Sequence, residues 1–142
     1  MIRTHARAIL SWLPAALYMT LIWGVSAIPA GHLPKVTFLV HDKLLHFTEY
    51  FVLGVLVYFA CHVSFAHLNN RFRYLLAFVI SVSWGIIDEC HQYYVPKRIP
   101  SVMDWLADTT GVAFALSLIA LLITLRTRRR IPDDSVINHF SG

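Results

Sequence analysis

Four long apolar stretches, separated by short polar segments, dominate the pattern of the chain. Each is close to the roughly 20 residues that a helix needs to cross the hydrocarbon core of a bilayer. A helix also satisfies its backbone hydrogen bonds internally, which lipid requires. The pattern therefore predicts four membrane-spanning helices at about Ala8–Ile28, Leu44–Val63, Tyr74–Tyr93 and Val102–Leu125. The expected fold is an all-α, polytopic four-helix bundle.

Composition supports the membrane class. The 142 residues are 57% hydrophobic and only 14% charged, and a soluble domain of this size could not hide that much apolar surface. We expect one membrane domain over residues 1–130 and a polar tail over 131–142 that is disordered. No stripe of Lys and Arg with interleaved aromatic residues is present in the sequence, so nucleic acid is not an expected partner.

The first apolar stretch has a second interpretation, as a cleaved signal peptide. Arg3 and Arg7 would form its basic region, and Val25-Ser26-Ala27 is similar to a cleavage site. However, the apolar run exceeds the 7–15 residues that are typical of a signal peptide. We therefore predict a retained span, with Pro14 in its first turns at a position where membrane helices tolerate a kink.

The distribution of basic residues predicts the orientation. Eight basic residues flank one side of the predicted spans and four flank the other. The richer side should be cytoplasmic, which places both termini inside and the loops 29–41 and 95–101 outside. The basic cluster that follows the fourth span fits an anchor to lipid headgroups. The expected location is the bacterial inner membrane.

Polar residues recur at helical spacing where three of the spans meet the outer side. Asp42, His46 and Glu49 share one face of the second span, and Asp104 and Asp108 share one face of the fourth. The third span ends with Asp88, Glu89 and Gln92. The topology therefore predicts a single polar cluster. It holds six acids and three certain cations, so some acids must be protonated, the histidines must be charged, or a cation must bind.

Several of these residues also have a structural interpretation. Asp42 and Asp104 could cap helix N-termini, Lys43 could extend to headgroups, and Gln92 could bond neighbouring helices. Glu49, Glu89 and Asp108 are the hardest to explain in this way, because a lone carboxylate at that depth is costly. A metal site is a further alternative, built from His46, Glu49, Glu89, His91 and Asp108. No zinc spacing such as H-E-x-x-H is present, so we predict no metal and no cofactor.

Three motifs give the chain a family resemblance. The first contains Asp42, Lys43, His46, Phe47 and Tyr50, the second Glu89, Gln92, Pro96 and Arg98, and the third Asp104, Asp108 and Gly111. In this order and at these separations, the chain resembles the VanZ-like family of small bacterial membrane proteins. The family pattern has Asn where this chain has Asp108, and commonly Gly where it has Lys97. The resemblance implies a four-span fold and a cell-envelope context with a link to teicoplanin resistance, but no reaction.

Two functional hypotheses follow. In the first, the protein binds or modifies an anionic lipid headgroup or a lipid-linked cell-wall intermediate at the outer leaflet. Glu89 and His46 are then the acid/base candidates, and the ligand-binding candidates are Lys43, Arg98, Gln92, Asp104, Asp42, Asp108, Glu49 and Tyr50. In the second, the cluster is a non-enzymatic core of a structural protein or of a small proton- or ion-coupled transporter. A metal-dependent hydrolase is a third possibility. The sequence does not decide whether the protein is an enzyme or what its oligomeric state is.

Overall fold

The described part of the chain is entirely helical between its loops. The computed structural model describes residues 2–29 and 39–129, and no strand occurs among them. The helices are α1 (Ile2–Ser11), α2 (Leu13–Ser26), α3 (Leu39–Ser64), α4 (Asn70–Gln92) and α5 (Val102–Arg128). Four helical segments are long and apolar enough to cross a membrane, with α1 and α2 together forming the first. The predicted all-α, four-span fold is confirmed, and the predicted tail lies outside the described residues.

The first span is interrupted near its start. α1 ends at Ser11 and α2 begins at Leu13, with Pro14 in the first turn of α2. Proline has no backbone N–H and its ring crowds the carbonyl four residues earlier, which breaks regular helical bonding. The break lies beside Pro14, at a position where membrane helices tolerate a kink.

The other three helices are longer than the apolar stretches that predicted them. α3 begins at Leu39 rather than Leu44, and α4 begins at Asn70 rather than Tyr74. The start of α4 has a physical cause. The side chain of Asn69 accepts a hydrogen bond from the backbone N–H of Phe72 at 3.0 Å, which satisfies one of the free donors at a helix N-terminus.

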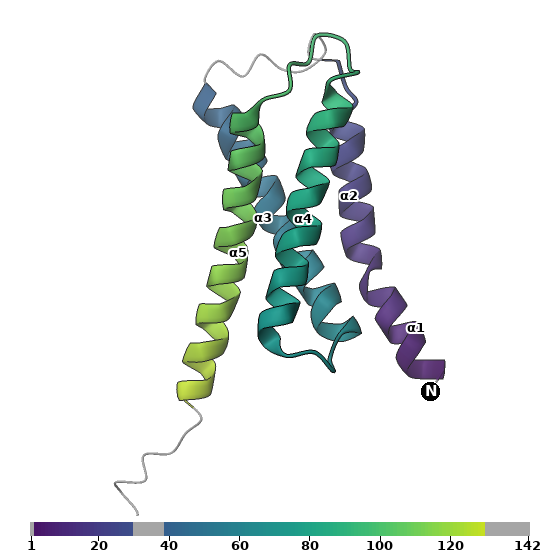
Figure 1. The fold of residues 1–142 in the computed structure, drawn as a ribbon, viewed down its shortest axis with the longest axis vertical. Helices are drawn as coiled ribbons and strands as arrows, with labels where there is room; N and C mark the ends of the chain where they lie inside the picture. The colour runs from purple at the N-terminus through teal and green to yellow at the C-terminus, as the bar shows by residue number, and fades with distance from the viewer. Residues whose placement is uncertain (1, 30–38, 130–142) are drawn as a thin grey trace, which may run out of the picture.

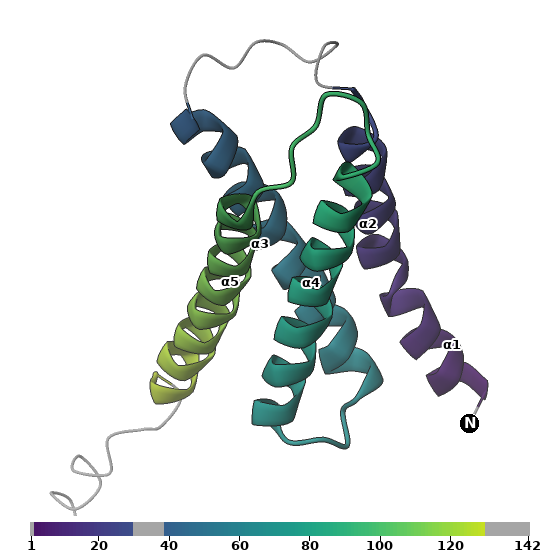
Figure 2. The same cartoon turned by 45° about the horizontal axis from the view of Figure 1, so that its top comes forward.

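α3 is the central helix of the bundle. It contacts each of the other four helices, and it runs obliquely behind α4 and α5 (Figure 1). The turned view shows α5 on one flank of α4, with α1 and α2 on the other (Figure 2). The C-terminal ends of α2 and α4 and the N-terminal ends of α3 and α5 lie at the same end of the bundle (Figure 1). Which membrane face this end meets remains a prediction from the basic residues.

α3 and α5 pack closely because small residues lie between them. A Cβ atom on Gly111 would overlap the carbonyl oxygen of Phe47 and lie 3.0 Å from the backbone nitrogen of Phe51. A Cβ atom on Gly54 of α3 would lie 3.3 Å from Cα of Val112 and 3.4 Å from Cβ of Ala115, both on α5. Since lipid provides no hydrophobic drive between helices, such close approach is a main source of their association. The backbone contact also fixes the spacing of the polar residues one turn above it.

Candidate functional site

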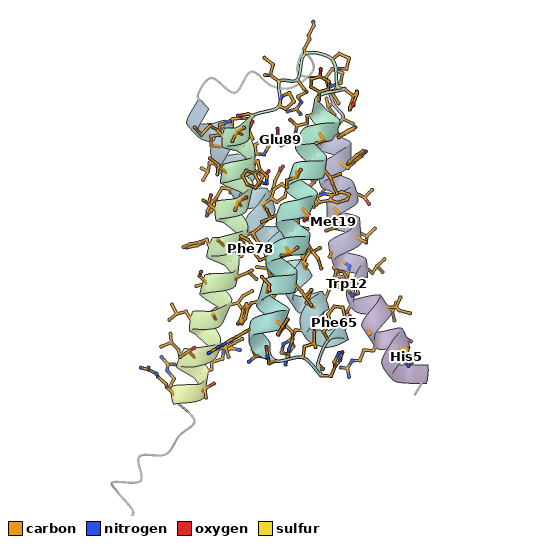
Figure 3. All side chains as sticks on the ribbon, in the orientation of Figure 1. His5, Trp12, Met19, Phe65, Phe78 and Glu89 are labelled. Atoms are coloured by element: carbon orange, nitrogen blue, oxygen red, sulfur yellow. The ribbon has the colours of Figure 1, made fainter. Side chains whose placement is uncertain are left out.

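The structure brings the predicted polar residues together at the end of the bundle where α4 ends and α5 begins. Figure 3 shows Glu89 there, between α4 and α5. Five carboxylate or amide side chains at this end are buried: Asp88, Glu89, Gln92, Asp104 and Asp108. We call them, with Lys43, His46 and Tyr50, the polar cluster. Its members come from α3, α4 and α5, so only the packing of three helices creates it.

His46 and Asp108 form the deepest ionisable pair of the polar cluster. Nδ1 of His46 lies 3.0 Å from Oδ1 of Asp108, and their side chains are only 12% and 1% exposed. This bond joins α3 to α5 and orients the imidazole ring. The second oxygen, Oδ2 of Asp108, is buried without a hydrogen-bond partner among the described residues.

Asp88 is bonded by two neutral side chains. Its Oδ2 accepts hydrogen bonds from Ser26 Oγ at 2.8 Å and from Gln92 Nε2 at 3.1 Å. Gln92 also donates to Ser26 at 3.3 Å. Gln92 therefore bonds neighbouring helices, which was the structural interpretation of this residue. Ser26 was missed as a member of the network because the sequence gives only a serine near the end of an apolar helix.

Glu89 connects the cluster to the start of α5. Its Oε2 accepts a hydrogen bond from the backbone N–H of Ser101 at 2.8 Å, and Ser101 is the residue that precedes the first turn of α5. A carboxylate at a helix N-terminus is favoured by the helix dipole. Its other oxygen, Oε1, is buried and has no hydrogen-bond partner within the described ranges.

The two expected phosphate-binding cations already have protein partners. Nζ of Lys43 donates to Asp42 at 3.3 Å and also bonds Asp104. Arg98 folds back onto the end of α2, where Nε donates to the carbonyl of Ile28 at 3.2 Å and Nη2 to that of Val25 at 3.3 Å. The carbonyl of Val25 also accepts a hydrogen bond from the backbone N–H of Ile28 at 3.1 Å, so Arg98 joins the loop after α4 to the C-terminal end of α2. Arg98, a ligand-binding candidate from the sequence, therefore bonds to backbone carbonyls at the end of α2.

Lys97 lies at the position where the family pattern commonly has glycine. Its φ angle is 63°, a left-handed conformation that glycine adopts readily and other residues at a cost. A glycine at this position would adopt the observed backbone of the loop between α4 and α5 without that cost.

The other candidates differ in their surroundings. Tyr50 is fully buried, and its hydroxyl has no hydrogen-bond partner in the described part of the chain. Its ring and Oδ2 of Asp108 both approach Gly85, at 3.3 and 3.4 Å from the position of a Cβ atom there. Glu49 is half-buried. His91 stacks on Trp23 of α2, with ring centroids 3.9 Å apart, so it acts at a helix interface.

An open groove lies between α4 and the start of α5. Its volume is about 360 Å³, and its lining includes Ile86, Glu89, Cys90, Pro100, Val102 and Trp105. A neighbouring hollow of about 300 Å³ shares Glu89, Cys90 and Pro100 and adds Tyr93 and Tyr94. Glu89 is the one ionisable carboxylate in both linings. The groove thus connects the outer surface of the bundle with the edge of the polar cluster.

Two triads of side chains have the composition of cation sites. One is Asp42, His46 and Asp104, and the other is His46, Glu89 and Asp108; in each triad one donor atom per residue lies within 4.8 Å of the others. Each triad draws its members from more than one helix, and His46, Glu89 and Asp108 are among the five residues of the metal alternative named from the sequence.

Comparison with known proteins gives one match. The model of the family described as VanZ/LLP1 matches residues 4–124. No curated protein and no solved structure matches the chain.

Proposed function

Since the chain belongs to the VanZ/LLP1 family and carries four helical segments able to cross a membrane, we propose that it is a multi-pass protein of the bacterial inner membrane that binds or modifies a phosphate-bearing lipid at the outer leaflet. The lipid is an anionic phospholipid or a lipid-linked cell-wall intermediate. The observation that carries the proposal is the groove between α4 and α5, whose mostly apolar lining contains one carboxylate, that of Glu89, beside Ser101 and Cys90.

The shape and lining of the groove fit a hydrocarbon chain whose polar end reaches Glu89. Small-molecule sites are mostly apolar, with a few polar groups that fix orientation. Ile86 and Val102 on the walls are 49% and 72% exposed, so a chain lying in the membrane could enter from the side. Tyr93 and Tyr94 are strongly exposed at the same end, as aromatic residues at a membrane interface commonly are.

Basic residues near this end supply attraction for a phosphate. Lys97 is exposed on the loop next to the second hollow, and Arg98 follows it. Lys43 is half-buried in the cluster. Arg98 uses two of its five N–H donors on backbone carbonyls, and Lys43 bonds two carboxylates, so both cations are already engaged. Of these three basic residues, the exposed Lys97 is therefore the most available to a phosphate.

Glu89 and His46 remain the acid/base candidates for a modifying reaction. Glu89 is the ionisable group that the groove reaches, and His46 is oriented by Asp108 in the manner of a base held by a carboxylate. A group transfer at a phosphate or its ester would need a proton moved at this position.

Native mass spectrometry with a polyprenyl monophosphate as probe tests the binding step. Cys90→Trp should fill the groove and lower the bound fraction at least tenfold. Val79→Trp is the matched control, because Val79 is a 50% exposed residue of α4 outside the groove lining. Equal binding by wild type and Cys90→Trp, or no binding by wild type, would contradict the proposal.

A cellular assay tests the link to glycopeptides. Cells that express the wild-type protein should differ in teicoplanin susceptibility from cells that express Glu89→Gln at the same level. If the two strains behave alike, Glu89 has no part in an envelope reaction that affects this drug.

The hydrogen bonds of Asp88 favour a second candidate function, a structural or ion-coupled polar core. This residue is almost fully buried and ties α4 to Ser26 of α2, which is the arrangement of an interhelical fastening. Under this alternative, Glu89→Gln should leave the cellular phenotype intact, while Asp88→Asn should lower the thermal stability of the purified protein.

A further inference from the structure

We propose that His46, Glu89 and Asp108 bind a divalent cation of the zinc or manganese type. One donor atom from each residue lies within 4.8 Å of the others, so small side-chain movements would bring all three to a common ion. The residues come from α3, α4 and α5. This cation site departs from the sequence-based prediction of no metal, and its three ligands are among the five residues of the metal alternative named from the sequence.

The distance between His46 and Asp108 suits a shared ion. Nδ1 and Oδ1 lie 3.0 Å apart. Two ligands at about 2.1 Å from one cation and at this separation subtend an angle of about 90° at the metal, which is the octahedral angle and is narrower than the tetrahedral angle usual for zinc. The present hydrogen bond would then be replaced by two metal–ligand bonds without moving either helix.

Unpartnered oxygens point independently to a missing positive group. Oδ2 of Asp108 and Oε1 of Glu89 are buried and lack hydrogen-bond partners among the described residues, and the two residues are 0% and 9% exposed. Buried polar atoms without partners are costly, and buried carboxylates more so. One imidazole cannot neutralise two carboxylates, whereas a divalent cation can.

The triad of Asp42, His46 and Asp104 is a poorer cation site, because the ammonium group of Lys43 already lies against two of its members. The ammonium group of Lys43 bonds both Asp42 and Asp104, so a metal there would have to displace it. Asp88 belongs to neither triad; its Oδ2 accepts two hydrogen bonds, while its Oδ1 is buried without a partner among the described residues. These contacts leave His46, Glu89 and Asp108 as the triad with unsatisfied negative charge.

The ligand set also indicates the class of ion. One imidazole nitrogen and two carboxylate oxygens suit zinc or manganese better than a soft ion that prefers sulfur. Three protein ligands leave coordination positions for water or for an oxygen of a phosphate. The cation site itself stands on geometry and burial, whereas its use in holding a phosphate headgroup rests on the proposed function.

Metal analysis of untagged protein, purified without chelator and stripped of lipid, tests the site. Wild type should carry about one equivalent of zinc or manganese, or take it up when the ion is added to chelator-treated protein, with a higher melting temperature. Asp108→Asn should weaken uptake at least tenfold. Asp88→Asn is the matched control, a neutralised aspartate in the same cluster, and should bind as wild type does. No uptake by wild type, or equal uptake by Asp108→Asn, would overturn the proposal.

X-ray absorption of zinc-loaded wild type keeps the test decisive if the variants do not fold. The expected spectrum has only nitrogen and oxygen ligands, with one imidazole. A sulfur ligand would place the ion at a cysteine and overturn the assignment. Because lipid is absent from both measurements, failure of the cation site leaves the polyprenyl phosphate experiment to decide the proposed function separately.

Discussion

Replacing Gly111 with alanine should separate α3 from α5 and disturb the site above their contact. A Cβ atom at this position would overlap the carbonyl oxygen of Phe47 and lie 3.1 Å from its carbonyl carbon. Carbon atoms pack favourably at about 3.5–4.0 Å, so the two backbones would have to move apart by roughly 0.5–1 Å. Neither backbone can rotate out of the way as a flexible side chain would.

The magnitude follows from two opposing effects. Inserting a methyl group into a closely packed contact costs about 1–3 kcal/mol, and this contact with backbone belongs near the upper limit. Alanine offsets about 1 kcal/mol of this cost, because it favours the helix over glycine by that amount. The net loss is about 2 kcal/mol, or a melting temperature lower by about 7 °C for a chain of this size.

The consequence for the site is a longer bond between His46 and Asp108. His46 precedes Phe47 on α3, and Asp108 lies one turn before Gly111 on α5. Their 3.0 Å bond should lengthen beyond hydrogen-bond distance if the helices separate by the estimated amount. We therefore expect Gly111→Ala to weaken zinc uptake as well as stability.

Thermal unfolding in detergent, followed by tryptophan fluorescence, checks this prediction. The matched control is Gly24→Ala on α2, where no described atom outside the local helix lies within 4 Å of the added Cβ. This control should unfold at the wild-type temperature or a few degrees above it. A Gly111→Ala protein as stable as Gly24→Ala would refute the inference that backbone contact holds α3 against α5.

Three further experiments test local features of the structure. Asn69→Ala should lower the free energy of unfolding by about 1 kcal/mol, because it removes the cap of α4. Asn69→Asp should keep most of the stabilisation by the cap, and chemical or thermal unfolding distinguishes the two variants. Lys97→Gly should raise stability by about 0.5–1 kcal/mol, because φ at this position is 63°; an unchanged or lower melting temperature would argue against that strain. N-ethylmaleimide should label exposed Cys90 and spare buried Cys61 in folded protein, as peptide mass spectrometry would show, and rapid labelling of Cys61 would contradict the packing of α3.

The sequence determined the number of spans, their approximate positions and the end of the bundle at which polar residues gather. Apolar length and helical spacing are local properties, so they could be read without knowing how the helices cross. The break at Pro14 was foreseeable for the same reason, since it follows from the covalent structure of one residue.

Tertiary structure alone decided which partners the polar side chains take. Arg98 could be assigned to a phosphate from sequence, but the packing of the loop brings it to the carbonyls of α2. Ser26 joins Asp88 across more than sixty residues, and no sequence motif marked it. His46, Glu89 and Asp108 meet because three helices cross at one depth and orientation. Such distances depend on interhelical packing, which side-chain periodicity within a single helix does not contain.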